Sequence, residues 1–232
     1  MGIVYELRRY RLKPGGYAAL SELFDRAFVS PQNELGMELP GEFADLDDPD
    51  TFVWLRSFPD MAVRRDALSA FYTGPVWRAH GDAANATMVN SDNVLLLKRT
   101  DSDLPLTRDV VRAMASEGMV VVTTCSLAPG GAEGFAAEFE AAARPVLERA
   151  GMKIAACFVT ESSPNSFPRL PIREGETVFV WLSVFASEEA YTAHRDALAV
   201  DPDWRDRVFP ALNRLVWRPM ETARLRLFPS AH

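Results

Sequence analysis

Three residues near the start of the chain carry side chains suited to acid–base and charge-stabilising chemistry. Glu6, Arg8 and Tyr10 are spaced two apart in a segment that alternates enough to form a strand, so their side chains share one face. A carboxylate and a phenol can transfer protons, and a guanidinium can stabilise a developing negative charge. We therefore predict Glu6, Arg8 and Tyr10 as catalytic residues of a small-molecule site.

A second segment, residues 52–58, adds an aromatic and a cationic side chain of matching parity, Trp54 and Arg56. Because buried charges must be paired, Glu6 is a natural partner for Arg8 or Arg56. We expect the two arginines to hold an anionic or carbonyl-bearing ligand, and Trp54 to form an aromatic wall for a flat substrate. A simpler interpretation also stands, in which these charges only satisfy one another and Trp54 only fills a core.

The segments that hold these residues belong to an internal duplication. The sequence LKPGG at residues 12–16 returns as LAPGG at 127–131, and FVWL at 52–55 returns at 179–182. The first pair is shifted by 115 positions and the second by 127, so the second copy contains an insertion of 127 − 115 = 12 residues. The Pro- and Ser-rich stretch 161–175 reads as a loop and accommodates it.

Each copy follows the order βαββαβ of a ferredoxin-like unit. In the first copy we expect strands over residues 3–12, 37–44, 52–58 and around 94–97, with helices between, and Asp60 begins the second helix as an N-cap. Ser187 takes that position in the second copy. We predict a first module over 1–99, a linker over 100–118 with a short helix at 108–115, and a second module over 119–232.

The fold class predicted is α+β, with the two modules packed sheet to sheet as an intramolecular α/β barrel and helices outside. Both faces of the 52–58 strand are too apolar for water, which favours closure against a second sheet. We expect Val53 and Leu55 to pack beneath helices. The opposite face, with Glu6, Arg8, Tyr10 and the aromatic residues, then points into the barrel lumen.

The second copy has smaller groups at the positions of the charged ones. The two shifts place Thr123, Cys125 and Ser183 where the first copy has Arg8, Tyr10 and Arg56, and Trp181 matches Trp54. We therefore expect one asymmetric site dominated by the first copy, because a fused pair can diverge where a homodimer cannot. The predicted substrate-binding residues are Trp54, Arg56, Thr123, Cys125, Trp181, Ser183 and, at the cavity mouth, His80.

Two segments of the sequence resemble those of a known protein family. The opening YELRRYRLKPG, residues 5–15, is similar to the start of NIPSNAP proteins. The FVWL strand, followed by a helix with Arg65 and Leu68 and then Trp77, resembles their second signature. The resemblance covers nearly the whole chain as two tandem modules. It implies the dimeric α/β-barrel superfamily, whose relatives include cofactor-free monooxygenases, lactone isomerases and heme-binding enzymes.

Composition excludes several classes of protein. With 48% hydrophobic and 25% charged residues the chain is not disordered, and a net charge of −7 opposes binding to nucleic acid. No apolar run approaches the ~20 residues of a membrane span, and the N-terminus lacks the apolar stretch of a secretory signal. We expect a cytoplasmic protein, with Cys125 and Cys157 as buried free thiols.

The sequence shows no metal-ligand spacing, nucleophile elbow or dinucleotide fingerprint, and its histidines do not stand in the context of a heme ligand. We predict a cofactor-independent enzyme, an isomerase, cyclase, lyase or monooxygenase-like protein, acting on a small organic metabolite of secondary metabolism. A non-catalytic ligand-binding or protein-interaction module is the alternative. The outer helix faces allow copies of the chain to associate into a homo-oligomer.

Overall fold

The structure is a computed structural model that describes residues 2–115 and 118–228. The predicted outer ends of the two modules, residue 1 and residues 229–232, and positions 116–117 of the predicted linker lie outside the described residues. Within the described part, no helix is long and apolar enough to cross a membrane.

Both repeats show the predicted order of elements. The first contains β1 (Val4–Leu12), α1 (Gly16–Leu23), η1 (Phe24–Phe28), α2 (Val29–Glu34), β2 (Glu38–Asp45), β3 (Thr51–Phe58), α3 (Met61–Thr73), α4 (Pro75–Thr87) and β4 (Met88–Arg99). The second contains β5 (Met119–Leu127), α6 (Ala132–Glu138), η2 (Phe139–Ala143), α7 (Arg144–Arg149), β6 (Lys153–Thr160), β7 (Thr177–Phe185), α8 (Glu188–Val200), η3 (Trp204–Val208), α9 (Phe209–Leu215) and β8 (Glu221–Leu227). Between them lies α5 (Arg108–Ala115), the predicted linker helix.

Local sequence explains where these elements begin. Gly15 and Gly130 follow the first strand of each repeat with φ angles of 75° and 78°, a left-handed conformation that favours glycine. The Asp60 carboxylate accepts hydrogen bonds from two backbone N–H groups at the start of α3, both at 2.8 Å. The Ser187 hydroxyl accepts one at the start of α8, so both predicted N-caps are confirmed.

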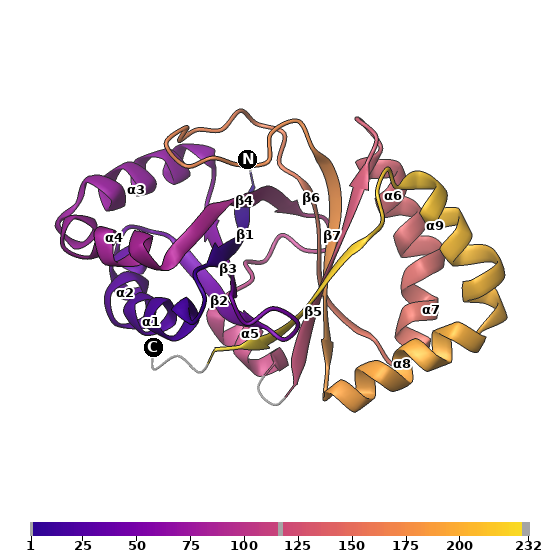
Figure 1. The fold of residues 1–232 in the computed structure, drawn as a ribbon. Helices are drawn as coiled ribbons and strands as arrows, with labels where there is room; N and C mark the ends of the chain where they lie inside the picture. The colour runs from indigo at the N-terminus through magenta and orange to yellow at the C-terminus, as the bar shows by residue number, and fades with distance from the viewer. Residues whose placement is uncertain (1, 116–117, 229–232) are drawn as a thin grey trace.

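The eight strands close into one antiparallel barrel in the order β1-β3-β2-β8-β5-β7-β6-β4. Each repeat supplies four adjacent strands, and the repeats join at two seams, β2–β8 and β4–β6. Helices α1–α4 cover the sheet of the first repeat, and α6–α9 cover the sheet of the second on the opposite side of the barrel (Figure 1). The predicted intramolecular barrel with outer helices is confirmed.

The predicted assignment of the two sheet faces is wrong. The lumen is filled by the aliphatic face, including Leu7, Val53, Leu55, Val180 and Leu182, which form one buried cluster. An eight-stranded barrel is only just wide enough for its own side chains, and this aliphatic face fills it together with the rings of Tyr5, Phe43 and Phe158. A cavity of about 40 Å³ is found at one end of the lumen. That space is too small for an organic substrate.

The linker helix closes against the lumen as well. Leu106, Val111 and Ala115 belong to the lumen cluster, and the Tyr5 hydroxyl accepts a hydrogen bond from the Leu106 backbone N–H at 3.0 Å. The segment between the repeats therefore contributes to the barrel core.

Candidate functional site

The charged residues predicted for the lumen lie instead between the first repeat's sheet and its helices. Glu6, Arg8 and Arg56 are 0–1% exposed, and Tyr10 and Trp54 belong to the apolar cluster beneath α1–α4. The structure brings Glu6, Arg8, Tyr10, Trp54 and Arg56 together, but in a packed layer on the opposite face of the sheet, so the predicted convergence on a lumen cavity is wrong.

Glu6 is the centre of this cluster. Its Oε2 atom accepts hydrogen bonds from Arg8 Nη1 at 2.9 Å, Arg56 Nε at 2.9 Å and Arg56 Nη2 at 2.5 Å. Its Oε1 atom lies 2.8 Å from Arg64 Nε and 2.7 Å from Arg64 Nη2. One buried carboxylate thus binds three buried guanidinium groups, which we call the arginine cluster.

Neutral groups complete the arginine cluster. Arg8 Nε donates to the Tyr10 hydroxyl at 2.8 Å, and Arg56 Nη1 donates to Gln32 Oε1 at 2.9 Å. The Arg8 and Arg56 guanidiniums also lie 5.4 and 4.9 Å from the centroid of the Trp54 ring, within cation–π range.

The surroundings fix the charge states of these groups. Burial by itself raises the pKa of Glu6, but the charges of Arg56, Arg8 and Arg64 outweigh it and hold that pKa far below its ordinary value. Burial raises the pKa of Tyr10, which Arg8 only partly offsets. Burial lowers the pKa of Arg64, and Glu6 offsets this in part. Glu6 is therefore an anion and Tyr10 a neutral phenol near neutral pH.

The same layer of the second repeat is built without these charges. The repeat shifts match Glu6, Gln32 and Arg64 with Val121, Leu147 and Tyr191. Cys125 and Trp181 lie in the apolar cluster beneath α6–α9, and the Ser183 hydroxyl donates to a backbone carbonyl. The structure therefore does not bring Thr123, Cys125, Trp181 and Ser183 together with the arginine cluster.

One unusual feature occurs in both layers. Within the described part of the chain, the buried indole N–H groups of Trp54 and Trp181 both lack a hydrogen-bond partner. Because the charged and the apolar layer share it, this feature belongs to the repeated fold and does not mark a site.

His80, predicted at a cavity mouth, lies on α4. Its ring faces Phe28, with 6.4 Å between the ring centroids, so it packs within the helix layer. His194 is buried beside Phe185, and its Nδ1 atom lies 3.0 Å from the Ala150 carbonyl oxygen, a structural position. Among the described residues, neither histidine forms a hydrogen bond or ring contact with a member of the arginine cluster.

Gln32 and Arg64 are site residues that the sequence reasoning missed. The resemblance drew attention to Arg65, which is exposed and pairs with its neighbour Asp66, whereas Arg64 is fully buried. A signal was present, since each of the two missed positions is polar in the first copy and different in kind in the second, as Leu147 and Tyr191. Comparing helix positions as well as strands would have found them.

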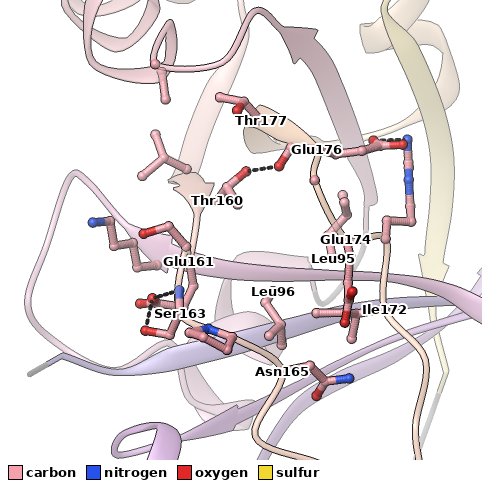
Figure 2. A pocket seen from close by; sticks show the side chains of 18 of the residues that line it. Leu95, Leu96, Thr160, Glu161, Ser163, Asn165, Ile172, Glu174, Glu176 and Thr177 are labelled. Carbon is pink, nitrogen blue, oxygen red and sulfur yellow. Dashed lines mark hydrogen bonds and ion pairs between the residues drawn. The ribbon is translucent and has the colours of Figure 1, made fainter. Parts of the chain in front are cut away.

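A cavity of about 950 Å³ opens at the β4–β6 seam. Its walls come from β4, the start of α6 and the inserted stretch 161–176, which we call the insertion loop. Figure 2 shows Leu96 near the centre of the view, with Glu161 and Ser163 on one side, Ile172, Glu174 and Glu176 on the other, and Asn165 below.

The cavity and the arginine cluster share one wall. Asn165 lines the cavity, and its Oδ1 atom accepts a hydrogen bond from Arg64 Nη1 at 3.0 Å. The Ser166 hydroxyl accepts a second one from the same nitrogen at 3.1 Å. Leu96, which also lines the cavity, is paired with Glu6 across β1 and β4. Only a short stretch of loop therefore separates the cavity from the buried charges.

The insertion loop reaches from the second repeat across the seam to the first. Figure 1 shows it running from β6 over the top of the barrel toward α3 and back to β7. Phe167 stacks on Tyr72 of α3 at 5.9 Å between ring centroids, and the Arg169 guanidinium also lies over the Tyr72 ring. Twelve extra residues in one copy thus cover the charged layer of the other.

The remaining reactive groups do not form a second centre in the described residues. Among residues 2–115 and 118–228, no group of three His, Cys, Asp or Glu side chains is placed to hold a metal ion. Cys125 and Cys157 are buried and free, as predicted, and burial raises the pKa of each thiol to about 12.

Solved structures with a similar fold support the barrel assignment. An anthrone oxidase-like protein matches with a TM-score of 0.66 and 11% identity, covering 98% of this chain and 92% of that one. Provisionally assigned monooxygenases from Fusobacterium nucleatum and Lactobacillus acidophilus NCFM match with TM-scores of 0.58 and 0.56 at 11% and 12% identity. These cover 97% and 98% of this chain, and 92% and 94% of their own. At such identities the likeness shows the fold alone.

A comparison with curated proteins found no match to this chain. The sequence profile of the NIPSNAP family, by contrast, matches residues 5–103 and again residues 121–231. These two segments correspond to the two repeats and together span most of the chain. The chain therefore belongs to the NIPSNAP family, with two copies of the family's module in one polypeptide.

Proposed function

We propose that this protein binds a small organic metabolite in the cavity at the β4–β6 seam and acts on it without a cofactor. The observation that carries the proposal is Asn165, which lines the cavity and contacts Arg64 of the arginine cluster. A ligand in the cavity would thus lie next to the most strongly charged buried groups of the first repeat.

The size and lining of the cavity suit such a ligand. A volume of about 950 Å³ lies at the upper end of the range of ordinary ligand pockets, ~300–1,000 Å³. Leu95, Leu96 and Val159 offer an apolar surface, and Glu161 and Glu174 offer carboxylates that can accept a proton. The arginine cluster would stabilise negative charge that develops on the substrate.

Proton transfer with charge stabilisation supports isomerisation, cyclisation or elimination. Removal of a proton from a carbon of the substrate leaves a carbanion, and a stabilised carbanion can also react with oxygen. The neighbours named as monooxygenases and as anthrone oxidase-like make oxygenation worth testing, although fold likeness alone does not assign a reaction. A non-catalytic metabolite-binding protein is the second candidate. It is favoured by the low pKa of Glu6, which makes that carboxylate a weak base.

Filling the cavity tests the proposed site. Ala136 on α6 lines the cavity, whereas its neighbour Ala137 is exposed and does not. In a thermal-shift screen of small aromatic and carboxylic compounds, Ala136→Trp should abolish the stabilisation seen with the wild type, and Ala137→Trp should retain it. If the compounds stabilise Ala136→Trp as much as they stabilise the wild type, this cavity is not the binding site.

Turnover separates the two candidate functions. Oxygen uptake and product formation would be followed with each compound that binds, anthrone included. An enzyme should convert at least one bound compound, and the conversion should disappear in Ala136→Trp. Binding without conversion across the panel would favour the non-catalytic protein.

A further inference from the structure

The arginine cluster contains more positive charge than its buried partner can neutralise. Arg8, Arg56 and Arg64 carry three positive charges, and among the described residues Glu6 is the only carboxylate that forms an ion pair with any of them. The side chains of all four are 0–1% exposed. An excess of two positive charges therefore lies beneath the helices of the first repeat.

The fold does not require this arrangement, because the second repeat is a control within the same chain. Its equivalent layer has Val121, Leu147 and Tyr191 where the first has Glu6, Gln32 and Arg64, and it packs as an apolar cluster. Replacing buried ion pairs by apolar residues is often neutral or stabilising. A charge excess kept in one repeat alone is thus better explained by a ligand than by packing.

Arg64 differs from the other two arginines in what it contacts. Arg8 and Arg56 each direct one further nitrogen at a buried neutral group, Arg8 Nε at Tyr10 and Arg56 Nη1 at Gln32. Arg64 directs its outer nitrogen, Nη1, at Asn165 and Ser166 of the insertion loop. These are neutral acceptors on a mostly exposed segment, and Asn165 already faces the cavity.

We infer that Arg64 receives the anionic end of the cavity ligand, a carboxylate or another planar oxygen anion, in place of Asn165 and Ser166. This inference rests on the proposed cavity site and specifies the class of its ligand. A guanidinium presents a rigid fork of N–H donors that matches two oxygens of one anion. The amide oxygen of Asn165 and the hydroxyl of Ser166 occupy that position in this structure, and the excess positive charge favours their replacement by an anion.

Matched pairs of ligands test whether a negative charge on the ligand strengthens binding. Benzoate and 2-naphthoate would be titrated against benzamide and 2-naphthamide, which have similar shapes without the charge. Binding would be followed by thermal shift and by the NMR signals of the arginine Nε–H groups. We expect the acids to bind about ten- to hundredfold more tightly than the amides, the range for a charge-assisted hydrogen bond.

Two variants of neighbouring arginines locate the effect. Arg64→Gln should remove the preference for the acids, while Glu6 keeps two arginine partners and the layer stays filled. Arg65→Gln removes an equal charge one position away, from an exposed side chain paired with Asp66, and should leave the preference intact. The double variant Asn165→Ala, Ser166→Ala should tighten acid binding, because it removes the groups that compete for Arg64.

The outcomes distinguish this inference from the proposed function. If acids and amides bind equally and Ala136→Trp abolishes both, the cavity site stands and the anion assignment is wrong. The assignment also fails if Arg64→Gln binds acids as the wild type does, or if no acid binds up to millimolar concentration. If acids prefer Arg64 but bind Ala136→Trp unchanged, the cluster is an anion site and the cavity proposal fails.

Discussion

At the scale of single residues, the charge state of Glu6 decides what the arginine cluster can do. A carboxylate that binds three guanidiniums stays ionised, so Glu6 cannot serve as a proton donor near neutral pH. Its geometry favours the role of fixing Arg8, Arg56 and Arg64 in place, which makes it a positioning residue. The catalytic roles of Glu6, Arg8 and Tyr10 remain predictions, and Tyr10 keeps its phenolic proton near neutral pH because burial raises its pKa.

Glu6→Gln should destabilise the protein by about 3–5 kcal/mol, because it leaves buried guanidiniums without a counter-charge. Urea unfolding at neutral pH measures the free energy of unfolding. The control is Glu34→Gln, an exposed position that should change this energy by no more than ~0.5 kcal/mol. Equal stabilities for the two variants would show that the arginines do not depend on Glu6.

The lowered pKa of Glu6 also makes stability depend on pH. Its stabilising contribution is fully present above the ordinary pKa of 4.5 and is lost as the pH falls toward the lower pKa of the folded state. The wild type should therefore lose stability steadily below about pH 4.5. Chemical unfolding curves at several pH values should show a smaller decline for Glu6→Gln over this interval.

His194 should affect stability in a different pH range. Burial lowers its pKa below 6.5, and the contact with the Ala150 carbonyl only partly compensates. The unfolded chain therefore binds the proton more readily, and stability should fall as the pH drops from 6.5 toward the folded-state pKa. His194→Gln should flatten the stability profile in this interval, which chemical unfolding curves at several pH values would measure. An unchanged slope in His194→Gln would contradict this.

At the scale of elements, the insertion loop is the segment of the second repeat that contacts the charged layer of the first. It has no regular secondary structure between β6 and β7, yet it contacts α3 through Phe167, Arg169 and the pair Asn165 and Ser166. A loop held by a few side-chain contacts can open at a small cost in free energy. Such opening would expose Arg64 to the cavity.

Phe167→Ala should therefore increase opening of the loop without unfolding the barrel. We expect proteolytic cleavage within residues 161–176 to become faster while the melting temperature changes little. Limited proteolysis with mass spectrometry identifies the cleavage site. Phe209→Ala, which removes a partly exposed ring on α9, serves as the control and should leave loop cleavage unchanged. Cleavage at the wild-type rate in Phe167→Ala would show that the stacking on Tyr72 does not hold the loop.

At the scale of the whole molecule, two layers of equal architecture differ in chemistry. Both lie between a four-stranded sheet and its helices, and each contains a π-helical turn at a matching place, η1 and η2. One layer is apolar and the other holds four buried charges. A single chain with two such layers can dedicate one to stability and the other to function, which a symmetric homodimer cannot do.

Transferring the second layer's residues to the first should give a folded protein without the proposed site. The six substitutions replace each member of the arginine cluster and its neutral partners by its counterpart: Glu6→Val, Arg8→Thr, Tyr10→Cys, Gln32→Leu, Arg56→Ser and Arg64→Tyr. We expect a cooperative unfolding transition with stability unchanged or increased by about 1–4 kcal/mol. Circular dichroism and urea unfolding test this. Loss of folding would mean that the charges are structural.

Much of the architecture could be predicted from the sequence. The duplicated LKPGG and FVWL segments, with the twelve-residue offset, located the repeats and the insertion, and their order gave the ferredoxin-like units and the barrel. Local signals were sufficient because turns, caps and hydrophobic periodicity act within a few residues of one another. The spacing of Glu6, Arg8 and Tyr10 also placed them correctly on one face, because side chains alternate along any strand.

Only the tertiary structure decided which face of each strand points inward. Alternation separates two faces but does not order them when both are apolar, and the lumen itself exists only after eight strands have closed. The contact of Asn165 with Arg64 likewise joins positions 101 residues apart, in different repeats. Such a contact depends on how the insertion loop crosses the seam, a path that no local pattern in the sequence specifies.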